Sequence, residues 1–147
     1  AGIGGIPIQK EGGMRIHRTT IAAALALVIG VMAIIAGGQV LFLGRDPGYY
    51  VIDWLVVYNF TVGVLSVGAA AWIWLRGWRA RGVAAIVLGA HATVMLTLLV
   101  AYRAVVAPDS LVAMTIRLSV WAIIAGMLYS LRHDTPGATR GLSTHGR

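Results

Sequence analysis

The stretch that decides the fold is GVAAIVLGAHATVMLTLLVAYRAVV, residues 82–106, in which no Asp, Glu, Lys or Arg occurs before Arg103. A helix rises 1.5 Å per residue, so about 20 apolar residues cross the hydrocarbon core of a bilayer. Three other runs have the same character, at residues 19–44, 48–75 and 110–131. The sequence therefore predicts an all-α membrane protein with four transmembrane helices.

The composition agrees with a membrane class and leaves little chain outside the runs. Hydrophobic residues make up 59% of the 147 residues and charged residues only 12%, whereas a soluble domain has about 25% charged residues. We expect one transmembrane domain at residues 19–131, preceded by an N-terminal cytoplasmic arm at 1–18. A basic cytoplasmic tail is expected at 132–147.

The basic residues predict an orientation. Nine of the twelve flank the expected membrane ends on one side; they are Lys10, Arg15, Arg18, Arg76, Arg79, Arg81, Arg132, Arg140 and Arg147. Only Arg45, Arg103 and Arg117 belong to the other side. Because basic residues favour the cytoplasmic face, both termini are predicted to be cytoplasmic. The short connectors predict an up-down-up-down bundle, and the basic residues predict that it lies in a cytoplasmic (inner) membrane.

Charge and cysteine content exclude several classes. The net charge of +7 is distributed around the spans rather than along one stripe, so it does not indicate nucleic-acid binding. The chain has no cysteine, which excludes disulfides, cysteine-ligated clusters and covalent haem. No metal-ligand, nucleotide-binding or hydrolase motif occurs, and the chain is more consistent with a non-enzyme.

Small residues spaced by four predict where helices pack, because membrane helices associate through close backbone approach. Span 3 has the most continuous stripe, Ala85, Gly89, Thr93 and Thr97, and we expect this to be its main packing face. The corresponding positions elsewhere are Ala33 and Gly37, Ser66 and Ala70, Thr115 and Ser119, and Ala122 and Gly126.

Polar residues at membrane depth are costly and need a partner or a water path. Counted at 1.5 Å per residue, one layer near the outer side contains Gln39, Asp53, Arg103 and Arg117, one from each span. We expect a structural cluster in which Asp53 pairs with Arg117 or Arg103.

A second layer, near the midplane, contains Asn59 and His91. One hypothesis is structural, with a neutral imidazole bonded to Asn59, Tyr58 or a backbone carbonyl. The other makes His91 and Asn59 a cofactor site for a quinone or a haem. The other histidines lie at the cytoplasmic side, so a haem held by two histidines of this chain is disfavoured, and a haem shared with another subunit stays open. His91 is nearly opposite the span 3 stripe, so we expect it to face outward, toward a partner.

Three segments carry a resemblance. The chain resembles the DoxX-like families of small four-span bacterial membrane proteins in these segments. They are Ala36-Gly37-Gly38 late in span 1, Leu41-Phe42-Leu43-Gly44 at the end of span 1, and the region of Gly63 in span 2. The resemblance implies a quinone-linked redox complex for some members. It assigns no functional residue here.

Three functional hypotheses follow. The leading one is an accessory or structural subunit of a larger membrane complex, energy-converting in the respiratory or photosynthetic sense. Its partners are other membrane subunits and lipids, in a homo- or hetero-oligomer. The second is a redox subunit with a quinone or haem pocket at His91. The third, a minimal transporter or channel, is disfavoured because the chain has no broken span or internal repeat.

Overall fold

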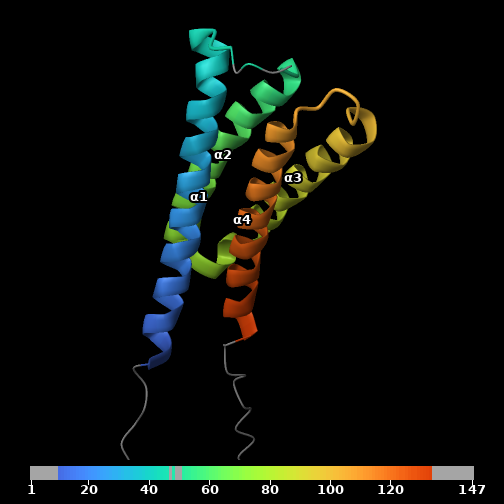
Figure 1. Cartoon of the computed structure of the whole chain (residues 1–147). Coiled ribbons are helices and arrows are strands. Elements are labelled where there is room, and N and C mark those ends of the chain that lie inside the picture. The colour runs from blue at the N-terminus through green and yellow to red at the C-terminus, as the bar shows by residue number, and fades with distance from the viewer. Residues whose placement is uncertain (1–9, 47, 49–50, 134–147) are drawn as a thin grey trace, which may run out of the picture.

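The structure, a computed structural model, describes residues 10–46, 48 and 51–133, and this part of the chain is all-helical (Figure 1). Its elements are α1 (Lys10–Leu43), α2 (Asp53–Arg76), the short 3-10 helix η1 (Gly77–Ala80), α3 (Arg81–Ala101) and α4 (Pro108–His133). Each of the four α-helices is long and apolar enough to span a membrane. The prediction of four spanning helices is confirmed at that level.

The helix ends differ from the apolar runs. Helix α1 begins at Lys10, within the predicted arm, because helical hydrogen bonds do not stop where the apolar residues stop. Helix α2 begins at Asp53 rather than at residue 48, and an acidic residue in the first turn complements the positive end of the helix dipole. Residues 1–9 and 134–147, which include nearly all of the predicted tail, lie outside the described residues.

The second half of the chain shows similar shifts. Helix α3 ends at Ala101 rather than 106, where the N–H of Tyr102 bonds to the carbonyl of Leu98. Helix α4 begins at Pro108, a residue that suits the first helical turn because its nitrogen has no hydrogen to satisfy. Helix α2 terminates at Gly77, whose φ of +56° favours glycine and allows η1 to follow directly.

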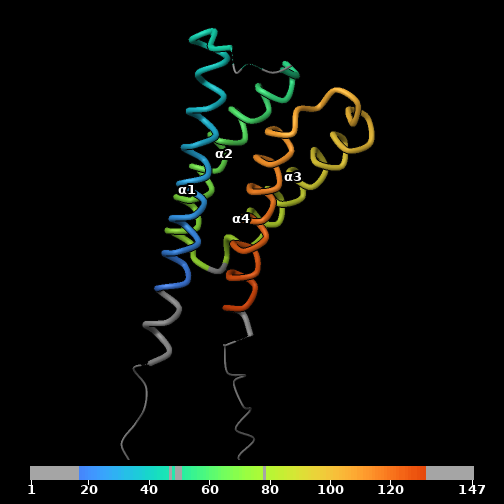
Figure 2. Tube along the Cα trace, viewed as in Figure 1, coloured from blue at the N-terminus to red at the C-terminus, as the bar shows by residue number. Residues whose placement is uncertain are grey.

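The four helices form two hairpins. Helices α1 and α2 make the most extensive contact, and α3 packs mainly on α4. Contact between α1 and α4 joins the hairpins, whereas α2 and α3 touch little. In the view of Figures 1 and 2, α2 and α3 slope in the same direction and are inclined to α1 and α4, and η1 lies near the end of the bundle where α4 terminates.

Backbone contact between glycines holds α1 against α2. A Cβ atom at Gly30 would lie 2.9 Å from the carbonyl oxygen of Gly63, and one at Gly63 would lie 3.0 Å from the carbonyl oxygen of Gly30. Gly37, a predicted packing residue, is buried against Phe60 in the same interface. Close approach of this kind is how helices associate in lipid, where the hydrophobic effect does not drive them together.

The small-residue stripes divide between the hairpins. In α1 and α2 they are buried between the helices, at Ala33, Gly37, Ser66 and Ala70. In α3 and α4 most of them are exposed; the exposed ones are Ala85, Gly89, Thr93, Thr115, Ser119, Ala122 and Gly126. A Cβ atom at Gly89 or Gly126 would meet nothing within 4 Å. The expectation that the α3 stripe packs inside this bundle is therefore wrong, because small residues permit close packing without specifying the neighbour.

The glycine contact gives the first prediction. Gly30→Ala should lower the free energy of unfolding by roughly 1–3 kcal/mol, because the new methyl group collides with backbone atoms that cannot rotate away. Thermal unfolding of the purified protein in detergent measures the change.

Gly68→Ala is the matched control, since Gly68 is an exposed glycine of α2 with no atom within 4 Å of its Cβ position. It should be neutral or stabilising, because alanine has the higher helix propensity. Equal stability of the two variants would contradict the close α1–α2 contact.

Candidate functional site

A layer of polar side chains separates two apolar cores. The large core gathers buried residues that include Ile73, Val87, Trp121 and Leu128. The small core consists of Ile52, Leu55, Leu98 and Met114. Tyr58 packs against both. The polar layer, which we define as Tyr58, Asn59, His91 and Arg117, lies between them.

Helical spacing explains why Tyr58, His91 and Arg117, one from each of three helices, reach this level, and Asn59 is adjacent to Tyr58 on α2. On α4, Arg117 follows Met114 of the small core by three residues and precedes Trp121 of the large core by four, so all three share a face. On α2, Tyr58 has the same relation to Leu55 and Val62. On α3, His91 follows Val87 by four residues and precedes Leu98 by seven. Each helix thus replaces one interior residue by a polar one.

His91 bonds to Tyr58 across the bundle. The Tyr58 hydroxyl and Nδ1 of His91 are 3.0 Å apart, and the two rings meet edge to face with centroids 5.9 Å apart. His91 is only 2% exposed, although the sequence led us to expect it to face outward. That expectation assumed an inward-facing stripe on α3; since the stripe faces out, the opposite side of the helix faces in. The bond joins α2 to α3, where the two helices otherwise touch little.

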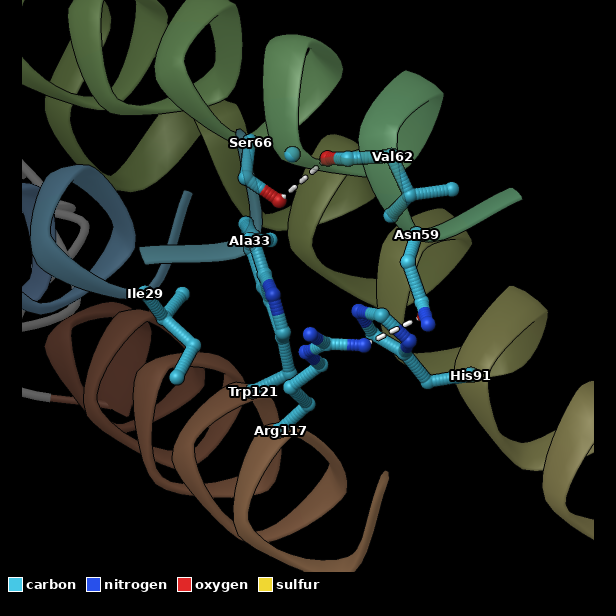
Figure 3. A pocket seen from close by; sticks show the side chains of 9 residues that line it. Ile29, Ala33, Asn59, Val62, Ser66, His91, Arg117 and Trp121 are labelled. Atoms are coloured by element: carbon cyan, nitrogen blue, oxygen red, sulfur yellow. Dashed lines mark hydrogen bonds between the residues drawn. The ribbon is translucent and has the colours of Figure 1, made fainter. Parts of the chain in front are cut away.

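Arg117 bonds to Asn59. Its guanidinium donates to the amide oxygen Oδ1 of Asn59, which joins α4 to α2, and Figure 3 shows the two side chains meeting beside the His91 ring. A charge at the centre of a membrane helix costs about 2.5–3.5 kcal/mol on insertion scales. Within the described part of the chain the guanidinium has this neutral partner and no carboxylate.

The predicted outer cluster does not form. Asp53 and Arg103 are exposed, and the side chain of Gln39 accepts a hydrogen bond from Arg45 at 3.0 Å. Counting residues along a helix gives depth but not the direction in which a side chain points. Arg117 therefore meets Asn59, more than one turn deeper along α2 than Asp53.

Asn59 and His91 do line one recess, as their predicted depths suggested, although each bonds to a different partner. The lining residues are Ile29, Ala33, Asn59, Val62, Gly63, Ser66, His91, Arg117 and Trp121 (Figure 3). Gaps between atoms amount to about 180 Å³, but no part is wide enough for a water molecule. A haem or quinone does not fit in this arrangement of the helices.

The recess contains a buried hydrogen-bond donor that has no acceptor. The Trp121 side chain is fully buried and its indole Nε1–H has no partner. The Asn59 oxygen already accepts from Arg117, and the Ser66 hydroxyl donates to the Val62 carbonyl at 2.7 Å. No group of three or more His, Cys, Asp or Glu residues in the described ranges is placed to hold a metal ion. The chemistry available is recognition of an acceptor or an anion.

No protein-family model matches the chain, and no similar curated protein or solved structure was found. The resemblance to DoxX-like proteins stays a prediction that rests on the residues quoted above.

Sequence reasoning missed one contact and one buried side chain. The pairing of Arg117 with Asn59 crosses the two layers assigned by depth, so only helix rotation reveals it. Trp121 carried a weak signal, because a tryptophan more than two turns from either end of its helix is away from the interfaces where this residue usually lies. Tyr58 was among the candidate partners of His91.

The Arg117–Asn59 bond gives the second prediction. Asn59→Leu should lower the free energy of unfolding by roughly 1–3 kcal/mol, because it leaves a partly buried cation without its acceptor. Adding Arg117→Leu should recover part of the loss, since both partners of the pair are then apolar. Unfolding in detergent measures each term of the cycle.

Asp53→Asn is the control for charge alone. Asp53 is exposed, so this change should alter stability by less than about 0.5 kcal/mol. A silent Asn59→Leu, or a large effect of Asp53→Asn, would contradict the observed pairing.

Proposed function

We propose that this chain is an accessory subunit of a larger membrane protein assembly, located in a bacterial cytoplasmic membrane. The observation that carries the proposal is the unequal use of the small-residue stripes. The α1–α2 hairpin uses its stripes internally, at Gly30, Gly63 and their neighbours. The α3–α4 hairpin presents its stripes outward, over both helices.

The outward small-residue positions of α3 and α4 can accept the helix of another protein. Thr93 donates to the Gly89 carbonyl and Thr97 to the Thr93 carbonyl, both at 2.9 Å, so these hydroxyls need no outside partner. Thr115 on α4 bonds back to Leu111 in the same way. The face is therefore flat and largely satisfied, and a helix of another subunit can approach its backbone closely. We propose such a helix as the occupant, in an energy-converting assembly.

The alternatives have less support from the contacts. A redox subunit needs a quinone or haem beside His91, but Nδ1 of His91 already bonds to Tyr58. A transporter needs an aqueous path, and the recess does not admit water. The absence of a catalytic motif in the sequence agrees with an accessory role.

The orientation is also a proposal. We place both termini in the cytoplasm with the helices running up, down, up and down, because nine of twelve basic residues then lie inside. The exposed Trp72 and Trp74 lie near the basic end of α2, and Arg76 stacks over the Trp72 ring at 5.3 Å. Tryptophan and arginine at a helix end are typical of a membrane interface.

Topology is open to a direct test, because the chain has no cysteine of its own. Gly82→Cys at the start of α3 should react with a membrane-impermeant maleimide only after cells are opened. Ala104→Cys in the α3–α4 connection should react in intact cells whose outer membrane has been permeabilised. Both positions are exposed, so neither should react slowly through burial. The reverse pattern would overturn the orientation.

Assembly is tested at the α3 face. Gly89→Leu should leave the purified chain folded, because the position is exposed. It should reduce the recovery of stoichiometric partner subunits after mild detergent extraction. A loss of about 1.4 kcal/mol of binding free energy at this contact corresponds to a tenfold lower recovery. Native mass spectrometry of the extract measures the ratio.

Gly68→Leu places the same bulk on an exposed glycine of α2 that lies between the larger Val64 and Trp72. It should retain the partners. A wild-type chain recovered only as a monomer or a homo-oligomer would contradict the accessory role.

A further inference from the structure

We propose that the recess at Arg117 binds the anionic headgroup of a membrane amphiphile, a carboxylate on an acyl chain being the simplest case. The site combines the Arg117 guanidinium, which has a neutral partner, with the buried Trp121 Nε1–H, which has none. The ligand reaches it from the hydrocarbon phase, between α2 and α3. This binding site is independent of the assembly role proposed above.

The first observation is a cation without an anion. Arg117 lies nine residues into α4, and its recorded partner is the neutral amide of Asn59. Arginine keeps its charge in proteins and has five N–H donors, of which this contact uses one. A carboxylate can accept two guanidinium N–H groups side by side, which a neutral amide oxygen does not.

The second observation is independent of the charge. Trp121 lies one turn further along α4 and lines the same recess, and its Nε1–H is fully buried with no acceptor. Buried donors without partners are rare in folded proteins, because each loses its hydrogen bonds to water and gains none in the protein. An anionic oxygen in the recess gives Trp121 an acceptor and Arg117 a counter-charge.

The surroundings select an amphiphile over a water-soluble anion. The recess has Ile29 and Val62 in its walls, and apolar cores lie on both sides of the polar layer. Water does not enter it, so a free anion would have to cross an apolar barrier with its hydration lost. The acyl chain of an amphiphile remains in hydrocarbon and offsets part of the cost of bringing its carboxylate to the polar layer.

Entry between α2 and α3 disturbs the least structure. Glycine backbone contact holds α1 to α2, and α3 packs on α4, whereas α2 and α3 share few contacts. The Tyr58–His91 bond spans this weak interface. Separating α2 from α3 breaks that bond, widens the recess and frees the Tyr58 hydroxyl as an additional donor. Binding therefore exchanges the Tyr58–His91 contact for contacts with the headgroup.

The experiment uses the full chain in a nonionic detergent and three probes. Oleate has the charge and the tail, methyl oleate has the tail without the charge, and acetate has the charge without the tail. Oleate should raise the unfolding temperature with a saturable dependence, because a ligand that binds only the folded state stabilises it. Methyl oleate and acetate should not.

Arg117→Gln should weaken oleate binding about ten- to hundredfold, the loss expected for a charge-assisted hydrogen bond. Arg103→Gln removes an exposed arginine beyond the end of α3 and should leave the affinity within about twofold. A response to methyl oleate equal to that of oleate would show a nonspecific apolar site. An equal response to acetate would show a free-anion site. Either result overturns the proposal.

A second readout does not depend on the folding of Arg117→Gln. Dibromostearate should quench wild-type tryptophan fluorescence saturably, and Trp121→Phe should remove the saturable part while keeping the charge. The methyl ester of dibromostearate should lack it in both proteins. The absence of a Trp121-dependent component in the wild type would show that no acyl carboxylate enters the recess, and would overturn the proposal.

Discussion

Hydrogen bonds that cross the bundle are the constraint on which the rest of the structure depends. Lipid offers no substitute for water, so a polar side chain at membrane depth must find its partner within protein. The Tyr58–His91 and Arg117–Asn59 bonds meet this requirement, and both connect α2 to the second hairpin. They fix the rotation of α3 and α4 in a bundle whose apolar surfaces alone would permit many rotations.

The two hairpins are built on different principles. The α1–α2 hairpin relies on backbone contact between Gly30 and Gly63, and Gly37 packs against Phe60. The second is joined to it through the contact of α1 with α4, the polar layer and the shared apolar cores. As a consequence, the first hairpin has little small-residue surface left for other proteins, and the second has most of its own available.

The sequence predicted the number of membrane-spanning helices but not their rotation. Span length follows from counting apolar residues, which is why the four helices agree with the four runs. Rotation cannot follow from the same residues, because a helix that is apolar on all sides has no distinct inner face. The predicted pairing of Asp53 with Arg117 therefore rested on depth alone. The prediction also placed the Ala85–Gly89–Thr93 stripe on the inner face of α3, whereas the structure has it on the outer face. For His91 the partner Tyr58 was among the candidates, but the outward direction expected for its side chain was wrong.

The arrangement also bears on how the chain enters the membrane. Residues are inserted in the order of synthesis, so α1 and α2 reach the bilayer first and find in each other a complete glycine-lined interface. Asn59 is then already at membrane depth when α4 arrives. The translocation machinery thus does not have to release Arg117 into lipid without a hydrogen-bond partner. The acceptor, Asn59, belongs to the half of the protein that was synthesised earlier.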